Sequence, residues 1–317
     1  MSSLSIVVPT VDRARVRGKA RRLYAATDIA ATGIAATGVA TTGITVGDIA
    51  ATGIDPGLDA RLRRRVCQQV AAIAPQLSIR RLSLLARYAL WCYQLDDRLD
   101  QPGADLAALS GLCDQIVMVA SGAGSSPGHD PLPAGLSGLL VELSSYDLDG
   151  AATERFRAAV ADAVMADLHH VRMARAVAAG SCRPPSMEEY LGVAARTVNY
   201  VSFACALLAL AAAPLGRAHL AAVEPALCLA ARAVRLGNDL RGAVRPAAGL
   251  NAVTLACGNG VAMTRRQIRA EIDRLARDHD RRLRARIAAG EVPQRAARAL
   301  IRCLAQSIRL YRHTDLR

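Results

Sequence analysis

The sequence predicts an all-α fold in a single helical domain. Of its 317 residues, 52% are hydrophobic and 21% are charged, a balance that supports a sizeable core and excludes a wholly disordered chain. From residue 57 onward, apolar residues recur at spacings of three and four, the period of an amphipathic helix. No alternating segment long enough for a convincing sheet interrupts this pattern. We therefore expect about eight to ten helices.

Residues 1–56 are set apart from this domain. Their second half, 27–56, repeats five-residue units that read TDIAA, TGIAA, TGVAT, TGITV, GDIAA and TGIDP. Glycine and β-branched residues are poor helix formers, and so few short units bury little surface by themselves. The sequence therefore predicts a low-complexity N-terminal leader over 1–56 and an α-helical domain over 57–317.

Glycine and proline punctuate the predicted helices. A glycine-rich and proline-rich loop covers 121–133, and Ser186 with Glu189 has the capping-box spacing that begins a helix after Pro185. The longest apolar run, 203–215, is too short for a membrane span, so none is expected. The expected helices are 58–74, 79–99, 104–120, 152–179, 186–213, 217–242, 262–289 and 293–312. The later breaks that carry glycine or proline are 180–185, 214–216, 242–249, 258–260 and 290–293.

Composition excludes several classes of protein. The net charge is +13, but the arginines are spread over many predicted helices and only 3% of residues are aromatic. Such a chain lacks the basic stripe and stacking rings of a nucleic-acid binder. The eight cysteines lie singly, with no C-x-x-C pair, which favours reduced cysteines over a zinc site or disulfides. Residues 1–10 lack a signal-peptide pattern, and we expect a cytoplasmic protein.

The first candidate site closes the predicted helix 79–99, where the sequence reads Asp96-Asp97-Arg98-Leu99-Asp100. Asp96 and Asp100 are offset by about 40° around the helix axis, so their carboxylates face the same way. Their charges repel each other and the partial negative charge of the helix end. Mg²⁺, which binds one or two carboxylates together with substrate phosphates, resolves that conflict. A solvated helix end, paired with Arg98, is the alternative.

The second candidate site closes the helix 217–242, where Asn238-Asp239 precedes Arg241 and Arg245. An amide oxygen and a carboxylate can both bind a hard cation, and arginines can hold phosphate oxygens with two hydrogen bonds. Taken alone, this segment also fits an ordinary helix end before a loop rich in glycine and proline.

Together, the two motifs resemble those of the class I terpene synthases, particularly bacterial diterpene synthases. Residues 96–100 match the aspartate-rich motif of that family in full, and Asn238-Asp239 begins what looks like its second metal motif, N-D-x-x-S/T-x-x-x-E. Residues 185–191 resemble the family's P-x-x-x-E-Y-L helix start, and residues 311–315 its C-terminal diphosphate-contacting segment. The resemblance covers about residues 58–317.

The second motif departs from the family pattern. Gly242 stands at the hydroxyl ligand position and Pro246 at the glutamate position, so only Asn238 remains of three ligands. The family's diphosphate-sensing arginine also lacks a counterpart, since alanines occupy the expected places and Arg196 is the nearest candidate.

The resemblance implies a helical bundle around a central apolar cavity. It implies a Mg²⁺-dependent enzyme, with three ions, that ionises an allylic prenyl diphosphate and converts the carbocation to a terpene hydrocarbon or alcohol. The expected substrate is a C20 diphosphate, linear or bicyclic. The implied catalytic residues are Asp96, Asp100 and Asn238. The implied metal ligands are Asp96, Asp97, Asp100, Asn238 and Asp239. The implied diphosphate-binding residues are Arg196, Arg241, Arg245, Tyr311 and Arg312. The expected pocket residues are Tyr88, Trp91, Cys92, Asn199, Tyr200 and Phe203.

The partners and the alternatives follow from the same residues. The chain lacks a D-x-D-D acid motif, because residues 147–150 read DLDG; a separate class II cyclase would supply any bicyclic substrate. A homodimer is compatible with the resemblance, and no nucleic acid is expected. A chain-elongating prenyltransferase shares the architecture but would carry a second full D-D-x-x-D. A non-catalytic helical binding protein with a degenerate site is the second alternative, suggested by Gly242 and Pro246.

Overall fold

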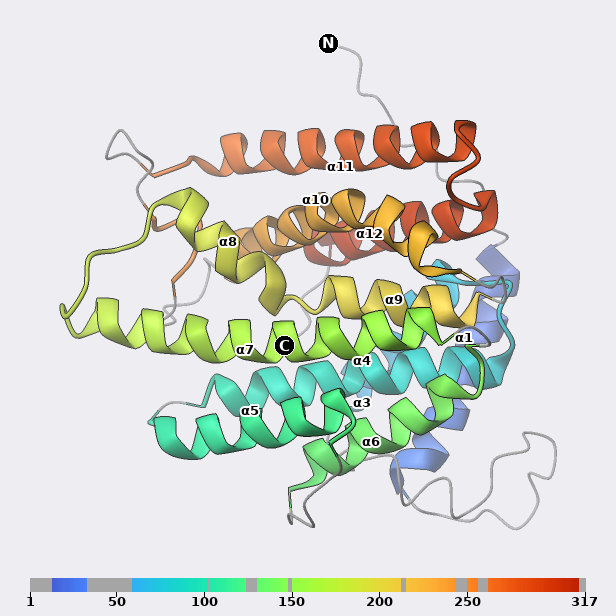
Figure 1. The fold of residues 1–317 in the computed structure, drawn as a ribbon, viewed down its shortest axis with the longest axis horizontal. Helices are drawn as coiled ribbons and strands as arrows, with labels where there is room; N and C mark the ends of the chain where they lie inside the picture. The colour runs from blue at the N-terminus through green and yellow to red at the C-terminus, as the bar shows by residue number, and fades with distance from the viewer. Residues whose placement is uncertain are drawn as a thin grey trace.

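The computed structural model describes residues 13–32, 59–101, 103–123, 130–147, 150–211, 215–242, 250–255 and 262–313. These residues form α-helices (Figure 1), and the prediction of an all-α fold is confirmed. The helices are α1 (Arg13–Thr32), α3 (Ala60–Ile73), α4 (Ile79–Leu99), α5 (Leu106–Ser121), α6 (Pro131–Ser144), α7 (Ala151–Ala178), α8 (Met187–Thr197), α9 (Tyr200–Leu210), α10 (Arg217–Gly242), α11 (Arg265–Ala288) and α12 (Gln294–His313).

Helix α4 lies at the centre of the bundle. It packs against α3, α6, α7 and α9, and its buried residues surround the helix rather than forming one stripe. On one side, α6 packs against α4, and α5 packs against α6 and α7; on the other side, α9, α10 and α12 separate α4 from the outermost helix, α11 (Figure 1). This arrangement brings the ends of α4 and α10, which carry the two candidate motifs, to the same cavity.

Helix α1 lies inside the segment that the sequence analysis set apart as a leader. It packs against α3 and α4, with Leu23 fully buried and Thr27 Oγ1 3.3 Å from the Cys67 sulfur. Val16, Ala20 and Leu23 carry the three-and-four spacing of a core-facing helix, a signal that precedes the repeat. The structure therefore corrects the boundary at residue 57. Most of the repeat, 33–56, lies outside the described residues.

Two further regions of the bundle differ from the sequence prediction. Helix α6 was not predicted, although Asp130 caps its first turn by accepting a hydrogen bond from the Leu132 amide, and Pro131 stands at its first position. The predicted helix 186–213 is two helices, α8 and α9, because Asn199 adopts φ 52° and ψ 19°. This left-handed conformation is rare outside glycine, and it ends the regular hydrogen bonding of α8.

The α8–α9 segment is also long and apolar enough to be a candidate membrane span. Met187–Leu210 is the one candidate among the described residues by length and composition, and 72% of its most apolar window is buried inside the protein. The break at Asn199 divides it. These observations favour a core element of the bundle.

Candidate active site

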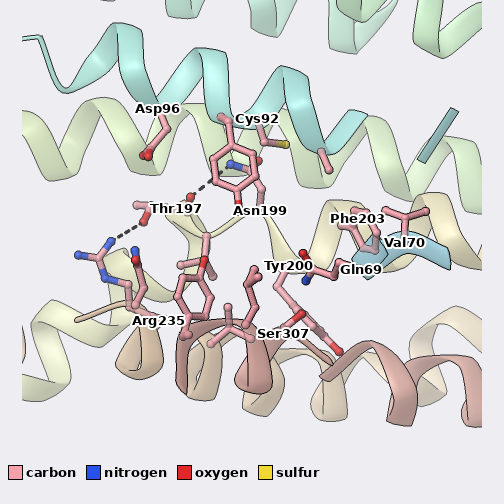
Figure 2. A pocket seen from close by; sticks show the side chains of 17 residues that line it. Gln69, Val70, Cys92, Asp96, Thr197, Asn199, Tyr200, Phe203, Arg235 and Ser307 are labelled. Carbon is pink, nitrogen blue, oxygen red and sulfur yellow. Dashed lines mark hydrogen bonds between the residues drawn. The ribbon is translucent and has the colours of Figure 1, made fainter. Parts of the chain in front are cut away.

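A cavity of about 130 Å³ opens between α3, α4, the α8–α9 junction, α10 and α12. Figure 2 shows Asp96 and Arg235 toward one end of this cavity, and Val70 and Phe203 toward the other. The lining residues are Gln69, Val70, Ala89, Cys92, Tyr93, Asp96, Thr197, Val198, Asn199, Tyr200, Phe203, Val234, Arg235, Asn238, Ser307, Leu310 and Tyr311. One charged end and a largely apolar remainder suit a ligand with an ionic head and a hydrocarbon tail.

The aspartate-rich motif reaches this cavity through Asp96. Ala89, Cys92 and Tyr93 line the cavity from the same helix, at seven, four and three residues before Asp96, so one helical face leads to the carboxylate. Asp97 and Asp100 are exposed and do not contribute to the lining, and Asp100 forms the C-terminal cap of α4. The structure thus brings one carboxylate of the motif to the cavity wall.

Negative charge accumulates beside this wall. Asp167 of α7 is half-buried. Desolvation, followed by the charge of Asp96, raises the pKa of Asp167 well above its usual range; Asp100 adds to the effect and Arg235 opposes it. Crowded oxygen donors of this kind fit a hard divalent cation. No three His, Cys, Asp or Glu side chains in the described part of the chain form a preformed metal cluster.

Helix α10 supplies Asn238 to the opposite wall. Its amide oxygen is a suitable ligand for the same kind of ion. One turn later, a Cβ on Gly242 would lie 3.5 Å from the Asn251 amide nitrogen, which itself donates to the Asp239 carbonyl oxygen. The space beside Gly242 is therefore bordered by a hydrogen-bonded amide group.

Asp239 does not line the cavity, contrary to its prediction as a metal ligand. Its Oδ2 accepts hydrogen bonds from the Tyr190 hydroxyl, at 2.8 Å, and from the Ala252 amide, at 3.2 Å. Its Oδ1 lies 2.9 Å from Nε of Arg235. Adjacent helical residues point about 100° apart, so the helix that directs Asn238 into the cavity directs Asp239 into the protein. Asp239 is a scaffold residue.

The predicted diphosphate-binding residues lie in different places, and only some of them are near the cavity. Arg196 does not line the cavity: its guanidinium, 45% exposed, donates to Asp162 of α7, so that prediction is corrected. Tyr311 lines the cavity, and Arg241 lies near enough to Tyr311 to favour its ionised form. Burial, then the charge of Asp96, nevertheless raises the pKa of Tyr311 to about 12. Arg245 and the side chain of Arg312 lie outside the described part of the chain.

Four of the predicted pocket residues line the cavity, namely Cys92, Asn199, Tyr200 and Phe203. The other two, Tyr88 and Trp91, are core residues instead. Trp91 is fully buried and donates from Nε1 to the Leu132 carbonyl oxygen at 2.8 Å. The Tyr88 ring lies edge-on to another buried ring, that of Phe156. These two predictions were wrong.

A chain of hydrogen bonds holds the α8–α9 break against α4. The Tyr88 hydroxyl donates to Ser202 Oγ at 2.6 Å, and Ser202 donates to the Asn199 carbonyl oxygen at 2.9 Å. The Asn199 carbonyl also accepts from the Phe203 amide. The side-chain oxygen of Asn199, by contrast, is buried without a hydrogen-bond partner. The break therefore places an amide group in the apolar cavity wall.

Sequence reasoning missed several lining residues. Arg235 and Tyr93 each lie three positions before a predicted ligand, Asn238 and Asp96 respectively, on a neighbouring part of the same helix face. A search at spacings of three and four from the motifs would have found both. No comparable signal marks the residues from α3 and α12, which are Gln69, Val70, Ser307 and Leu310.

Tyr311 approaches α10 closely because residue 237 is glycine. A Cβ on Gly237 would lie 3.4 Å from Cβ of Tyr311. The missing side chain lets α12 pack close to α10 and places Tyr311 in the cavity wall.

An all-helical bundle in which an aspartate-rich helix faces a second motif across one cavity has the class I terpene synthase fold. Comparison with solved structures agrees. 2-Methylisoborneol synthase from Streptomyces coelicolor A3(2), solved with Mg²⁺ and geranyl-S-thiolodiphosphate, superposes with a TM-score of 0.68 at 15% identity, over 97% of this chain and 94% of that chain. Germacradien-4-ol synthase from Streptomyces citricolor gives 0.60 at 19% identity, over 99% and 100% of the two chains.

The SVS_A2 protein from ancestral sequence reconstruction gives a TM-score of 0.65 at 15% identity, over 94% of this chain and 86% of that chain. No protein-family profile matches the sequence, and no curated protein matches it. The chain therefore has the fold of the bacterial class I terpene synthases at low sequence identity.

Proposed function

We propose that this protein is a class I terpene synthase that ionises an allylic prenyl diphosphate and converts the carbocation to a terpene hydrocarbon or alcohol. The observation that carries the proposal is the single cavity lined by Asp96 from α4 and Asn238 from α10. An oxygen donor on each wall suits a diphosphate held with divalent cations, and the remaining wall suits the hydrocarbon chain.

Asp96 and Asn238 would hold Mg²⁺ directly, and Asp97 and Asp100 would add negative charge at the end of α4. When bound, Mg²⁺ neutralises the diphosphate and stabilises it as a leaving group. Three ions remain the expected number. Tyr311 and Arg241 would contact diphosphate oxygens from the same end of the cavity.

The cavity wall would offer no ionised side chain that could react with the carbocation. Burial raises the pKa of the Cys92 thiol and of the hydroxyls of Tyr93 and Tyr200 well above their usual values. These groups stay neutral at physiological pH, so neither a thiolate nor a phenolate is available to capture the cation. The rings of Tyr93, Tyr200 and Phe203 can stabilise positive charge through their faces.

The proposed substrate is a C20 diphosphate, linear or supplied in bicyclic form by a separate class II cyclase. A cavity of about 130 Å³ is close to the roughly 150 Å³ of an engineered cavity that holds benzene. Binding a C20 chain therefore requires lining side chains to move. The proposed location of the enzyme is the cytoplasm.

The test is incubation of the full chain with Mg²⁺ and the C10, C15, C20 and bicyclic C20 diphosphates, followed by gas chromatography of the extract. Product from one of these substrates is expected, and Asp96→Ala should abolish it. Asp114→Asn, an exposed carboxylate on α5, is the control and should retain activity.

Other outcomes separate the alternatives. A longer prenyl diphosphate, formed only when a homoallylic co-substrate is added, would identify a chain-elongating prenyltransferase. No Mg²⁺-dependent release of pyrophosphate from any substrate would identify a binding protein with a degenerate site. Normal turnover by the Asp96→Ala variant would overturn the assignment of Asp96.

A further inference from the structure

Three helices, α1, α3 and α12, carry the net positive charge of this protein. They hold 15 of the 40 basic residues and one of the 27 acidic residues, Asp28. The other 25 basic residues of the chain are balanced by 26 acidic residues. The net charge of +13 therefore comes from these three helices. The sequence analysis, which set α1 apart from the domain, found no such concentration.

The three helices are neighbours in the bundle. α3 packs against both α1 and α12, and side chains of α1 and α12 meet at the turn that joins α3 to α4. Lys19 of α1 donates from Nζ to the Pro75 carbonyl oxygen at 2.7 Å. Arg302 of α12 donates from Nε to the Ile73 carbonyl oxygen at 2.9 Å. The exposed basic side chains of these helices thus belong to one surface, which we call the basic face.

The basic face lacks the ion pairs that arginines make elsewhere on the surface. On α10, for example, Arg217 pairs with Glu154. On the basic face, Arg21 of α1, Arg61 of α3 and Arg298 of α12 are exposed, and their side chains have no ion-pair partner among the described residues. Their charges are therefore available to a partner.

The positive charges of the basic face also repel one another. Burial, followed by the charges of Arg15 and Arg22, lowers the pKa of Lys19. Burial, followed by the charge of Arg298, lowers the pKa of Arg302. An anionic partner would relieve this repulsion.

We infer that the basic face binds the surface of a membrane that contains anionic lipids. An acidic protein partner would be held by large apolar or aromatic anchors. The exposed large apolar side chains of the described residues, Met118, Val141 and Met165, lie instead on α5, α6 and α7. A membrane surface requires no such anchor, because each basic residue near anionic headgroups contributes through its charge. Arginine can also hold a headgroup phosphate with two hydrogen bonds.

Duplex nucleic acid is the other extended polyanion, and the choice of a membrane over it rests on the proposed function. A terpene hydrocarbon or alcohol leaves water for lipid because its surface is apolar. Helices α3 and α12 carry the basic face and also line the cavity, through Val70 and Leu310. A membrane bound to the basic face would therefore lie close to the cavity in which that product forms.

The experiment is co-sedimentation of the full chain with vesicles of phosphatidylcholine, either alone or with about one third phosphatidylglycerol. Binding to the anionic vesicles alone is expected. It should disappear between about 0.1 M and about 1 M salt, over which the Debye length falls from about 10 Å to about 3 Å. No binding, or equal binding to both kinds of vesicle, would overturn the inference.

A triple variant tests the residues. Arg21→Gln, Arg61→Gln and Arg298→Gln together remove one exposed charge from each helix of the basic face. The triple variant should bind anionic vesicles about 100-fold more weakly, at about fivefold for each basic residue near an anionic membrane. Circular dichroism and thermal unfolding check that it folds. If it does not, each single substitution should weaken binding about fivefold.

The matched control removes the same net charge from another part of the surface. Arg183→Gln, Arg217→Gln and Arg232→Gln replace arginines that pair with carboxylates, and this second triple variant should bind like the wild type. Equal losses in the two triple variants would show that net charge alone acts, and would overturn the basic face.

A second titration separates a membrane from nucleic acid. Duplex DNA of random sequence is added to the wild type at about 0.15 M salt, the physiological ionic strength. Tighter binding to DNA than to anionic vesicles would overturn the membrane in favour of nucleic acid.

The inference and the proposed function can fail separately, because vesicle binding requires no turnover. Binding that depends on the basic face, without product from any prenyl diphosphate, would retain the membrane surface and refute the enzyme. Product without vesicle binding would retain the enzyme and refute the membrane surface.

Discussion

The ends of α4 and α10 carry similar residues but use them differently. At the end of α4, Asp96 faces the cavity and lies near enough to a second carboxylate, Asp167, to help raise the pKa of Asp167. At the end of α10, Asp239 is buried among an arginine, a tyrosine and a backbone amide. An aspartate in an acidic motif is thus a candidate ligand or a structural anion according to the face of the helix that carries it.

The largest expected effect contrasts the stabilities of two alanine variants. Asp239→Ala leaves Arg235 buried without its ion-pair partner, which should lower the free energy of unfolding by about 3–5 kcal/mol. Asp96 is exposed, so Asp96→Ala should change the stability of the metal-free protein by about 1 kcal/mol or less. Urea unfolding with EDTA measures both. Equal destabilisation by the two substitutions would remove the distinction between the cavity and the scaffold.

The pH dependence of stability tests the buried residues around Tyr190 and Arg235. His170 of α7 packs its ring 5.9 Å from that of Tyr190, and burial, then the charge of Arg235, lowers its pKa to about 3. The folded state disfavours the protonated imidazole, so stability is lost as the pH falls from about 6.5 toward 3, by up to about 1.4 kcal/mol per pH unit.

Replacing His170 by glutamine should remove this slope while leaving other acid-sensitive groups unchanged. Urea unfolding at intervals between pH 7 and pH 4 compares the two proteins. Parallel curves for the variant and the wild type would show that His170 does not titrate in this window.

A hydroxyl deletion gives a smaller effect. The Tyr190 hydroxyl accepts from Arg235 and donates to Asp239, so Tyr190→Phe should cost about 1–3 kcal/mol of unfolding free energy. Tyr146→Phe is the matched control, because the Tyr146 hydroxyl is buried without a hydrogen-bond partner. Its removal should be neutral or stabilising in thermal unfolding. A reversed order of the two variants would contradict the role given to Tyr190.

The smallest change in stability is expected at the α8–α9 break. Asn199→Gly relieves a left-handed residue and removes a buried unpaired oxygen, two favourable effects, but glycine loses more backbone entropy on folding. The net change should stay within about 1 kcal/mol. The same substitution removes an amide from the cavity wall, so the product distribution should change in gas chromatography even though stability does not. Unchanged products would show that the amide does not contact the substrate.

Helical periodicity accounts for what could be predicted of the site. Cys92 is offset by about 40° from Asp96 and lines the cavity, whereas Trp91 is offset by about 140° and lies in the core. A stricter use of the helical period would have excluded Trp91 from the predicted pocket residues. The fold class was predictable because most helices carry this period along their length.

Other features could not be predicted from local pattern. The break at Asn199 lies inside a segment that the spacing predicts as one helix, and no glycine or proline marks it. The environment of Asp239 depends on Tyr190 and Ala252, which are distant in sequence. Spacing along one helix cannot show which wall a neighbouring helix covers, and for the same reason Arg196 was placed in the wrong environment.

The close packing of α12 on Gly237 has a consequence for synthesis on the ribosome. Ser307, Leu310 and Tyr311 complete a cavity whose other walls come from earlier helices. When α3, α4 and α10 have left the ribosome, the apolar cavity wall that they form stays exposed until α12 also leaves it and packs against them. Exposed apolar surface promotes aggregation. A chaperone that covers the open cavity before α12 docks should therefore improve the yield of soluble protein.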